Sequence, residues 1–230
     1  MSGALNSVMG GSGGGLLGAI GGIVGGMFGG PIGAMIGQAI GNMLQQAVGD
    51  AVKDAATQLT KEAGMPKFLA DLVHEAVDKA IKEAHTPVSA EAADKAGQFK
   101  DQVQDFTSDL TNKLVEATRK YMESARESES SASGKPAGKA SGKSWLEAIA
   151  RAMGEVLGDK AAKLVELSNK ISEVANAGGD KDAQAQAAKE MSALQSEMQG
   201  VSQMFSLLQN AFNNAIKSIG EGLSQMARKG

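Results

Sequence analysis

The chain of 230 residues contains no cysteine, which excludes disulfides, thiol catalysis and thiolate metal sites. Aromatic residues make up only 3% of it, so a large conventional core is difficult to build, because aromatic side chains usually supply much of the buried area. Proline is also scarce, at 4 residues, whereas Ala, Gln, Lys, Glu, Ser and Met are abundant outside a glycine-rich region. This composition predicts an all-α protein.

Charge and histidine are equally uninformative about catalysis. The chain has 23 basic and 26 acidic residues, a balance that does not indicate nucleic-acid binding. Its only two histidines, His74 and His85, are too far apart for the i, i+4 pair of a helical zinc site, and each is predicted to be a surface residue. No phosphate-binding loop motif is present. We therefore predict no enzyme activity: no catalytic residue, metal site, cofactor or small-molecule substrate.

No charged residue precedes Asp50, and residues 14–49 form an apolar glycine segment. Its glycines recur every four positions, in two rows. The first row is Gly14, Gly18, Gly22, Gly26 and Gly30. The second row is Gly21, Gly25, Gly29, Gly33, Gly37 and Gly41. Because residues four apart share a helix face, such rows indicate a flat surface that another helix backbone can approach closely.

Pro31 is expected to break this segment into helices at about 15–29 and 32–48. A helix of that length spans about 22 Å, which is shorter than the ~30 Å hydrocarbon core of a bilayer. A kinked helix or a shallow hairpin therefore fits the segment better than two complete crossings. Since glycine costs about 0.5–1 kcal/mol relative to alanine in an aqueous helix, three alternatives stay open: membrane insertion, packing against copies of itself, or a flexible tail.

The remaining sequence divides by composition. Residues 1–13 are predicted to be a disordered tail, 50–126 an amphipathic helical region, 127–143 a flexible Ser/Gly/Lys linker, and 144–230 a helical hairpin or coiled-coil domain. Helix starts are predicted near Pro66, at Ser89, and at Ser144, where Glu147 completes a capping box. The helix after Ser89 is expected to run to about Ser124.

The last helix, from about Lys181 to Arg228, has apolar residues at a seven-residue period. This pattern indicates a coiled coil or bundle, and it makes these positions the candidate oligomerisation surface. The predicted surface consists of Met191, Leu194, Met198, Val201, Phe205, Leu208, Phe212, Ile219 and Met226.

The stretch GAIGGIVGGMFGGPIGAMIGQAIG resembles the glycine-zipper segments of bacterial membrane-associated and pore-forming proteins. The whole chain also resembles bacterial type III-secreted proteins, namely harpins in composition and the filament, tip and translocator proteins in its carboxy-terminal helix. The resemblance is one of composition and includes no fixed motif. It implies a secreted bacterial protein whose helices assemble with copies or with a secretion chaperone, and whose apolar segment meets a membrane.

The fold expected from these patterns is therefore all-α, with a glycine-zipper amino-terminal segment, amphipathic middle helices and a carboxy-terminal antiparallel hairpin. We expect a secreted, membrane-associated protein without a classical signal peptide, because no basic residue precedes the apolar run. Its expected partners are a lipid membrane and copies of itself. Two alternatives remain: a structural subunit of a secretion filament or appendage with no lipid role, and a toxin that depolarises membranes.

Overall fold

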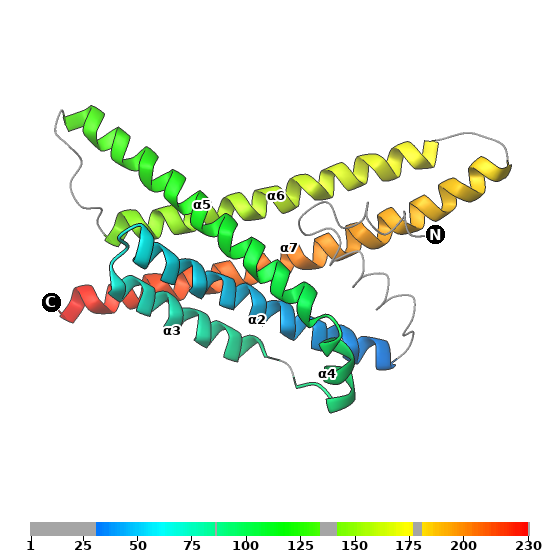
Figure 1. Ribbon diagram of the computed structural model, residues 1–230, viewed down its shortest axis with the longest axis horizontal. Coiled ribbons are helices and arrows are strands. Elements are labelled where there is room, and N and C mark those ends of the chain that lie inside the picture. The colour runs from blue at the N-terminus through cyan, green and yellow to red at the C-terminus, as the bar shows by residue number, and fades with distance from the viewer. Residues whose placement is uncertain (1–30, 86, 134–141, 177–180, 230) are drawn as a thin grey trace. The chain divides into compact units, whose positions relative to one another are not determined.

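A computed structural model describes residues 31–85, 87–133, 142–176 and 181–229, and these contain six helices (Figure 1). The helices are α2 (Pro31–Glu62), α3 (Lys67–Ala84), α4 (Ala90–Gly97), α5 (Lys100–Ser133), α6 (Gly142–Asn176) and α7 (Lys181–Lys229). Of the described part, 94% is helical and no residue lies in a strand, which confirms the all-α prediction.

The chain divides into two compact units, and each is built from separate stretches of sequence. The first unit comprises Met1–Leu44, Thr86–Phe106 and Gly158–Leu207. The second comprises Gln45–His85, Thr107–Leu157 and Leu208–Gly230. Four helices, α2, α5, α6 and α7, contribute residues to both units. The five regions that composition indicates are therefore not the units into which the chain packs.

Helix α2 crosses the boundary between the glycine segment and the amphipathic region without a break at residues 49–50. The change from uncharged to mixed-charge sequence alters the exposed face of the helix, whereas its buried face stays apolar on both sides of the boundary. That face includes Ile36, Ile40, Leu44, Val48, Val52 and Leu59, all at most 4% exposed.

Three helix ends differ in how well the sequence predicts them. Ser89 caps α4, since its hydroxyl accepts a hydrogen bond from the Ala92 amide at 3.3 Å, as predicted. Pro66 lies at the start of α3, after Gly64, whose φ of +76° is the left-handed conformation that glycine adopts at helix ends. The prediction for Ser144 was wrong, because α6 begins at Gly142 and Ser144 lies inside its first turn.

The helix expected between residues 89 and 124 is divided, and its second part is longer than expected. A turn at residues 98–99 separates α4 from α5. Helix α5 then continues to Ser133, through residues 127–133 that composition assigns to the linker. Serine and glutamate in this stretch are compatible with a helix whose hydroxyls bond back to it, as Ser128 does to the Ser124 carbonyl at 2.9 Å.

In the second unit, α2 packs closely on α3 at Gly49 (Figure 1). A Cβ atom built on Gly49 would lie 2.4 Å from Ile81 Cδ1 and 2.9 Å from Val77 Cγ1. Gly41, two turns earlier on α2, has no atom within 4 Å of its built Cβ. Each step of four residues turns about 40° round a helix, so glycines of one row come to face different neighbours.

We predict opposite effects of filling these two glycines. Gly49→Val is expected to lower the free energy of unfolding by about 1–3 kcal/mol, because the new methyl groups overlap Ile81 and Val77. Gly41→Ala is expected to raise it by about 0.5–1 kcal/mol, because the space is open and alanine favours the helix. Urea unfolding followed by circular dichroism measures both, and equal effects of the two substitutions would contradict the assignment of Gly49 to a helix contact.

Candidate functional site

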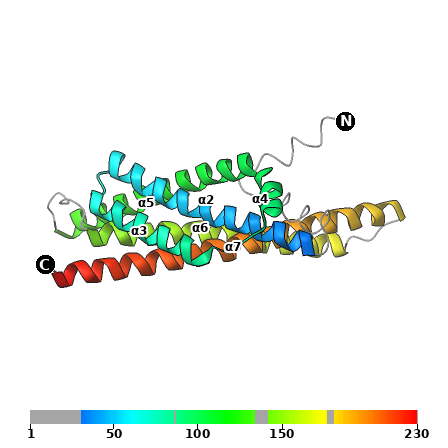
Figure 2. The ribbon, with the colours of Figure 1, turned by 90° about the horizontal axis from the view of Figure 1, so that it is seen from below.

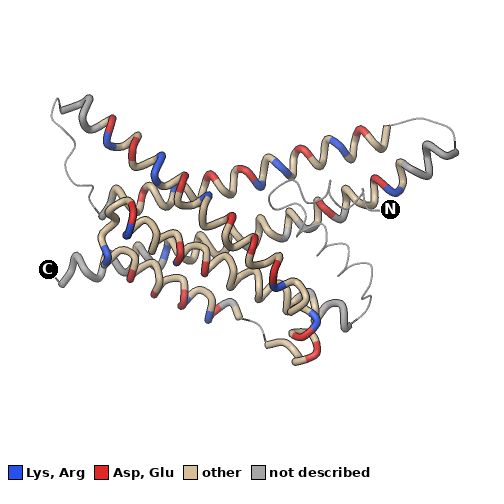
Figure 3. The backbone as a smooth tube through the Cα atoms, viewed as in Figure 1, with Lys and Arg blue, Asp and Glu red and all other residues tan. Residues whose placement is uncertain are grey.

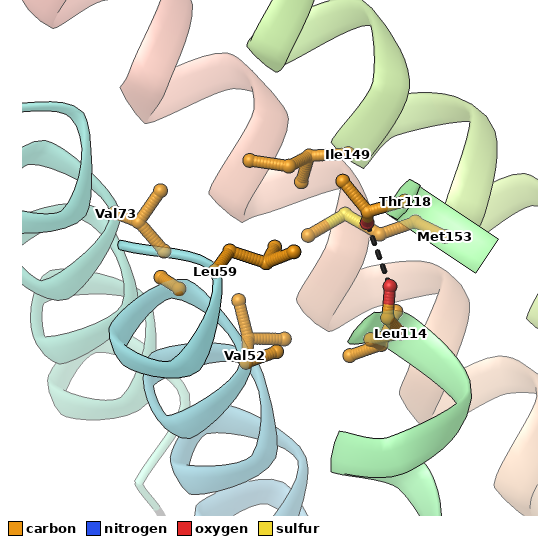
Figure 4. Close-up of a pocket in the computed structure, with 9 residues that line it drawn as sticks. Val52, Leu59, Val73, Leu114, Thr118, Ile149 and Met153 are labelled. Carbon is orange, nitrogen blue, oxygen red and sulfur yellow. Dashed lines mark hydrogen bonds between the residues drawn. The ribbon is translucent and has the colours of Figure 1, made fainter. Parts of the chain in front are cut away.

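The most constrained part of the second unit is an apolar junction where α2, α3, α5 and α6 meet around a small cavity (Figure 4). Figure 4 shows side chains from all four helices pointing toward this space. Its lining is Val52, Ala55, Ala56 and Leu59 from α2, Val73 from α3, Leu114 and Thr118 from α5, and Ile149 and Met153 from α6. The cavity volume is ≈ 10 Å³, which is at the lower limit of the space that one water needs.

The junction is almost entirely apolar. Its one hydroxyl, on Thr118, donates to the Leu114 carbonyl of the same helix at 2.6 Å and is thereby satisfied without a partner across the cavity. A dry cavity lined in this way has no group to hold a cofactor or to move a proton. The described residues also contain no cluster of three or more side chains that could hold a metal ion.

Polar contacts join α2 to α3 beside this junction. Lys53 Nζ on α2 forms ion pairs with Asp50 at 3.0 Å and with Asp78 of α3 at 3.1 Å. Burial lowers the pKa of Lys53, but the hydrogen bonds from Asp50 and Asp78 outweigh it and leave this pKa above its ordinary value. The charged form of Lys53 is therefore the stable one, and the pairs hold at neutral pH.

His74 adds a second link between the same two helices. Its Nε2 atom lies 3.1 Å from the Lys53 carbonyl oxygen and 3.2 Å from Thr57 Oγ1. The prediction that His74 is a surface residue was therefore wrong: the ring is half-buried and joins α3 to α2. Its position on the face that carries Val73 and Val77 was the available signal, since both neighbours are apolar and one turn or less away.

A separate cluster joins α5 to α6. Lys120 Nζ lies 3.4 Å from Glu155 Oε1, and Lys120 and Arg151 lie 5.8 and 5.9 Å from the centre of the Tyr121 ring. Hydrogen bonding to Glu155 raises the pKa of Tyr121, and the same interaction lowers the pKa of Glu155. The single tyrosine of the chain thus helps to hold these two helices together.

The predicted glycine rows lie mostly outside the described residues. Gly14, Gly18, Gly21, Gly22, Gly25, Gly26, Gly29 and Gly30 are not described. Gly33, Gly37 and Gly41 belong to α2, and of these Gly41 has the open surroundings given above. The glycine that does make a close helix contact, Gly49, was not among the predicted positions; it follows Gly41 by two steps of the same row.

The predicted oligomerisation residues lie on α7, and several are buried within a single chain. Val201, Leu208 and Phe212 are at most 2% exposed. Met191, Leu194, Met198 and Phe205 are half-buried, and the surroundings of Ile219 and Met226 lie outside the described residues. The seven-residue period thus serves packing inside the chain first, and the half-buried positions 191–198 are the described part still open to another molecule.

In the first unit, α6 and α7 run side by side as an antiparallel hairpin (Figures 1 and 2). Lys163 of α6 pairs with Glu197 of α7 at 3.8 Å, and Leu167 is buried between them and their neighbours. Val165 on the same helix is 61% exposed. Acidic and basic residues alternate along both arms where they are described, so neither arm has a surface of one charge (Figure 3).

No family model, curated protein or solved structure matches this chain. Within the described residues, no helix has the length and apolar character that a bilayer-crossing segment requires.

We predict that the junction limits the stability of the protein. Leu59→Ala is expected to lower the free energy of unfolding by about 2–5 kcal/mol, because it enlarges a cavity that is already present. Val165→Ala, which shortens an exposed apolar side chain, is the control and should change it by less than about 0.5 kcal/mol. Urea unfolding compares the two, and a small effect of Leu59→Ala would show that the junction is not part of the core.

A second prediction concerns pH. Because the folded-state pKa of Glu155 is lowered, the stability from its contacts is present above its unfolded pKa and is lost as pH falls through the folded value. Tyr121→Phe removes the largest cause and should raise the Glu155 pKa. Carboxyl NMR titration measures it, with Lys170→Met, which removes a partner of Glu166 instead, as the control. An unchanged Glu155 pKa in Tyr121→Phe would contradict the assigned cause.

Proposed function

We propose that this chain is a secreted, non-enzymatic bacterial protein that associates with lipid membranes through its glycine segment and with further copies of itself. The observation that supports the proposal most directly is the pair Gly41 and Gly49 on α2. Gly49 shows that a glycine of this helix accepts a neighbouring helix at very short distance, and Gly41 presents a similar gap that no described residue fills.

The uncharged sequence around Gly41 supports a lipid role. All residues before Asp50 lack charge, and α2 continues this uncharged sequence from Pro31 into the core of the second unit. In a bilayer, the hydrophobic effect no longer drives helices together, so small residues that allow close packing decide which helices associate. A glycine row without charged neighbours is suited to that environment, and it is poorly suited to water.

Self-association is supported by α7. Met191, Leu194 and Met198 continue the seven-residue period of Val201 and Leu208 but remain only half-buried within the chain. A second hairpin of the same kind would complete their burial, as in four-helix bundles formed from two helical hairpins. This part of the proposal would not need a secretion chaperone, although a chaperone with an apolar helix would fit the same positions.

A structural subunit without a lipid role is the second candidate. It is favoured by Val165, which is 61% exposed on α6 of the hairpin that carries the half-buried residues of α7. Light scattering of the intact protein in buffer without lipid separates the two candidates. Large assemblies that form without vesicles would favour the structural subunit, whereas assembly that requires vesicles would favour the membrane protein.

We predict that replacing Gly22, Gly26, Gly33 and Gly37 with leucine abolishes dye release from anionic vesicles. Leucine keeps or increases affinity for lipid, so vesicle flotation should persist, but its side chain prevents helices from approaching closely. The control is Gly154→Leu with Gly158→Leu, two helical glycines of α6 with no atom within 4 Å of the built Cβ.

Dye release by the control should equal that of the unmodified chain. If the fourfold variant also releases dye normally, the glycine rows do not act as an association surface. If the unmodified chain itself fails to float with vesicles, the membrane role is wrong.

A further inference from the structure

Helix α2 has two different kinds of neighbour in the second unit. On the α3 side the contact is specific: Ile81 lies against Gly49, Lys53 pairs with Asp78 at 3.1 Å, and His74 lies 3.1 Å from the Lys53 carbonyl. The short connection from Glu62 to Lys67, with its left-handed Gly64, joins the same two helices covalently. Helices α2 and α3 therefore form a hairpin held by shape and by polar contacts.

On the α5 and α6 side the contact is apolar and less complete. The cavity lies at this junction, and α2 contributes two alanines to its lining, Ala55 and Ala56, which offer little area to bury. The contact of Thr111 Oγ1 with the Ala51 carbonyl is long, at 3.4 Å. The Arg119–Glu62 ion pair is largely exposed and so adds little, while Arg119 Nε is buried without a hydrogen-bond partner among the described residues.

Helices α5 and α6 are in turn joined to each other by polar contacts. The Lys120–Glu155 ion pair and the Tyr121 ring between Lys120 and Arg151 connect them. The described contacts thus link α2 with α3 and α5 with α6, and the imperfect junction lies between the two pairs (Figure 4).

We propose that the α2–α3 hairpin separates from α5 and α6 as one piece and places its freed apolar face on a lipid surface. This inference rests on the membrane role proposed above and names the step that makes it available. The freed face includes Val52, Leu59, Leu69 and Val73, all buried in the closed chain. The opposite face of α3 is charged, so the hairpin has the amphipathic character of helices that lie in a membrane interface.

Phe68 indicates where lipid contact begins. It lies in the first turn of α3, directly after Lys67, and is 47% exposed before any opening. A basic residue beside an exposed aromatic ring is suited to the headgroup region of an anionic bilayer. Contact there would favour the open state, because lipid covers the apolar face that water would otherwise meet.

Two disulfide locks test the step, and the absence of native cysteine makes both specific. The first joins Ala51→Cys to Thr111→Cys, across α2 and α5, where Thr111 Oγ1 contacts the Ala51 carbonyl. The second joins Gly49→Cys to Ile81→Cys, within the hairpin, where the built Cβ of Gly49 lies 3.0 Å from Ile81 Cγ1. Flotation with anionic vesicles and dye release are measured for each, before and after reduction.

The 51–111 lock should abolish both flotation through the hairpin face and dye release, and reduction should restore them. The 49–81 lock should leave both at the level of the unmodified chain. Release by the oxidised 51–111 variant, or a block by the 49–81 lock, would overturn the inference while leaving the membrane role intact. Failure of the unmodified chain to bind vesicles would instead overturn the membrane role itself.

A measurement that needs no lock gives an independent answer. Spin labels at positions 54 and 79 report the distance within the hairpin, and labels at 54 and 123 report the distance from α2 to α5; all three positions are exposed. On adding vesicles, the 54–79 distance should stay constant and the 54–123 distance should increase. Constant distances for both pairs would show that the hairpin does not leave.

Discussion

The central constraint on this protein is that α2 must be covered by other helices although its own side chains are small. Its buried face alternates Ile, Leu and Val with several alanines, among them Ala47, Ala51, Ala55 and Ala56. Such a face allows helices to approach closely but removes little apolar area from water per residue. The second unit therefore depends on the exact fit at Gly49 and on a junction that leaves a cavity. Close approach and modest stability have the same origin.

The same feature connects fold and proposed function. A helix that packs through glycine and alanine can exchange one helical neighbour for another, because few large side chains have to be rearranged. Gly49 meets α3 within the chain, whereas Gly41 meets no described atom. If lipid supplies the environment and another copy supplies the neighbour, the glycine rows upstream of Gly41 continue an interaction that the chain already uses once.

The sequence predicts the kind of element far better than it predicts how the elements pack. Helical spacing and capping residues were sufficient for α3 and for the start of α4 at Ser89, because both depend on residues close together in the sequence. The change of composition at Asp50 did not mark a helix end, since charge altered only the exposed face of α2. Contacts such as Lys53–Asp78 and Arg119–Glu62 join residues far apart in the chain, so no local pattern contains them. The seven-residue period of α7 predicted an apolar face correctly but did not distinguish a neighbour in the same chain from one in another copy.

The central claim is that the uncharged amino-terminal part of the chain meets lipid. Limited proteolysis with proteinase K, with peptides identified by mass spectrometry, tests this most directly in the presence and absence of anionic vesicles. The account predicts that cleavage sites within the first 49 residues become protected when vesicles are added, while sites in 163–199 of the α6–α7 hairpin are cut at an unchanged rate. Identical cleavage of the first 49 residues with and without vesicles would contradict it.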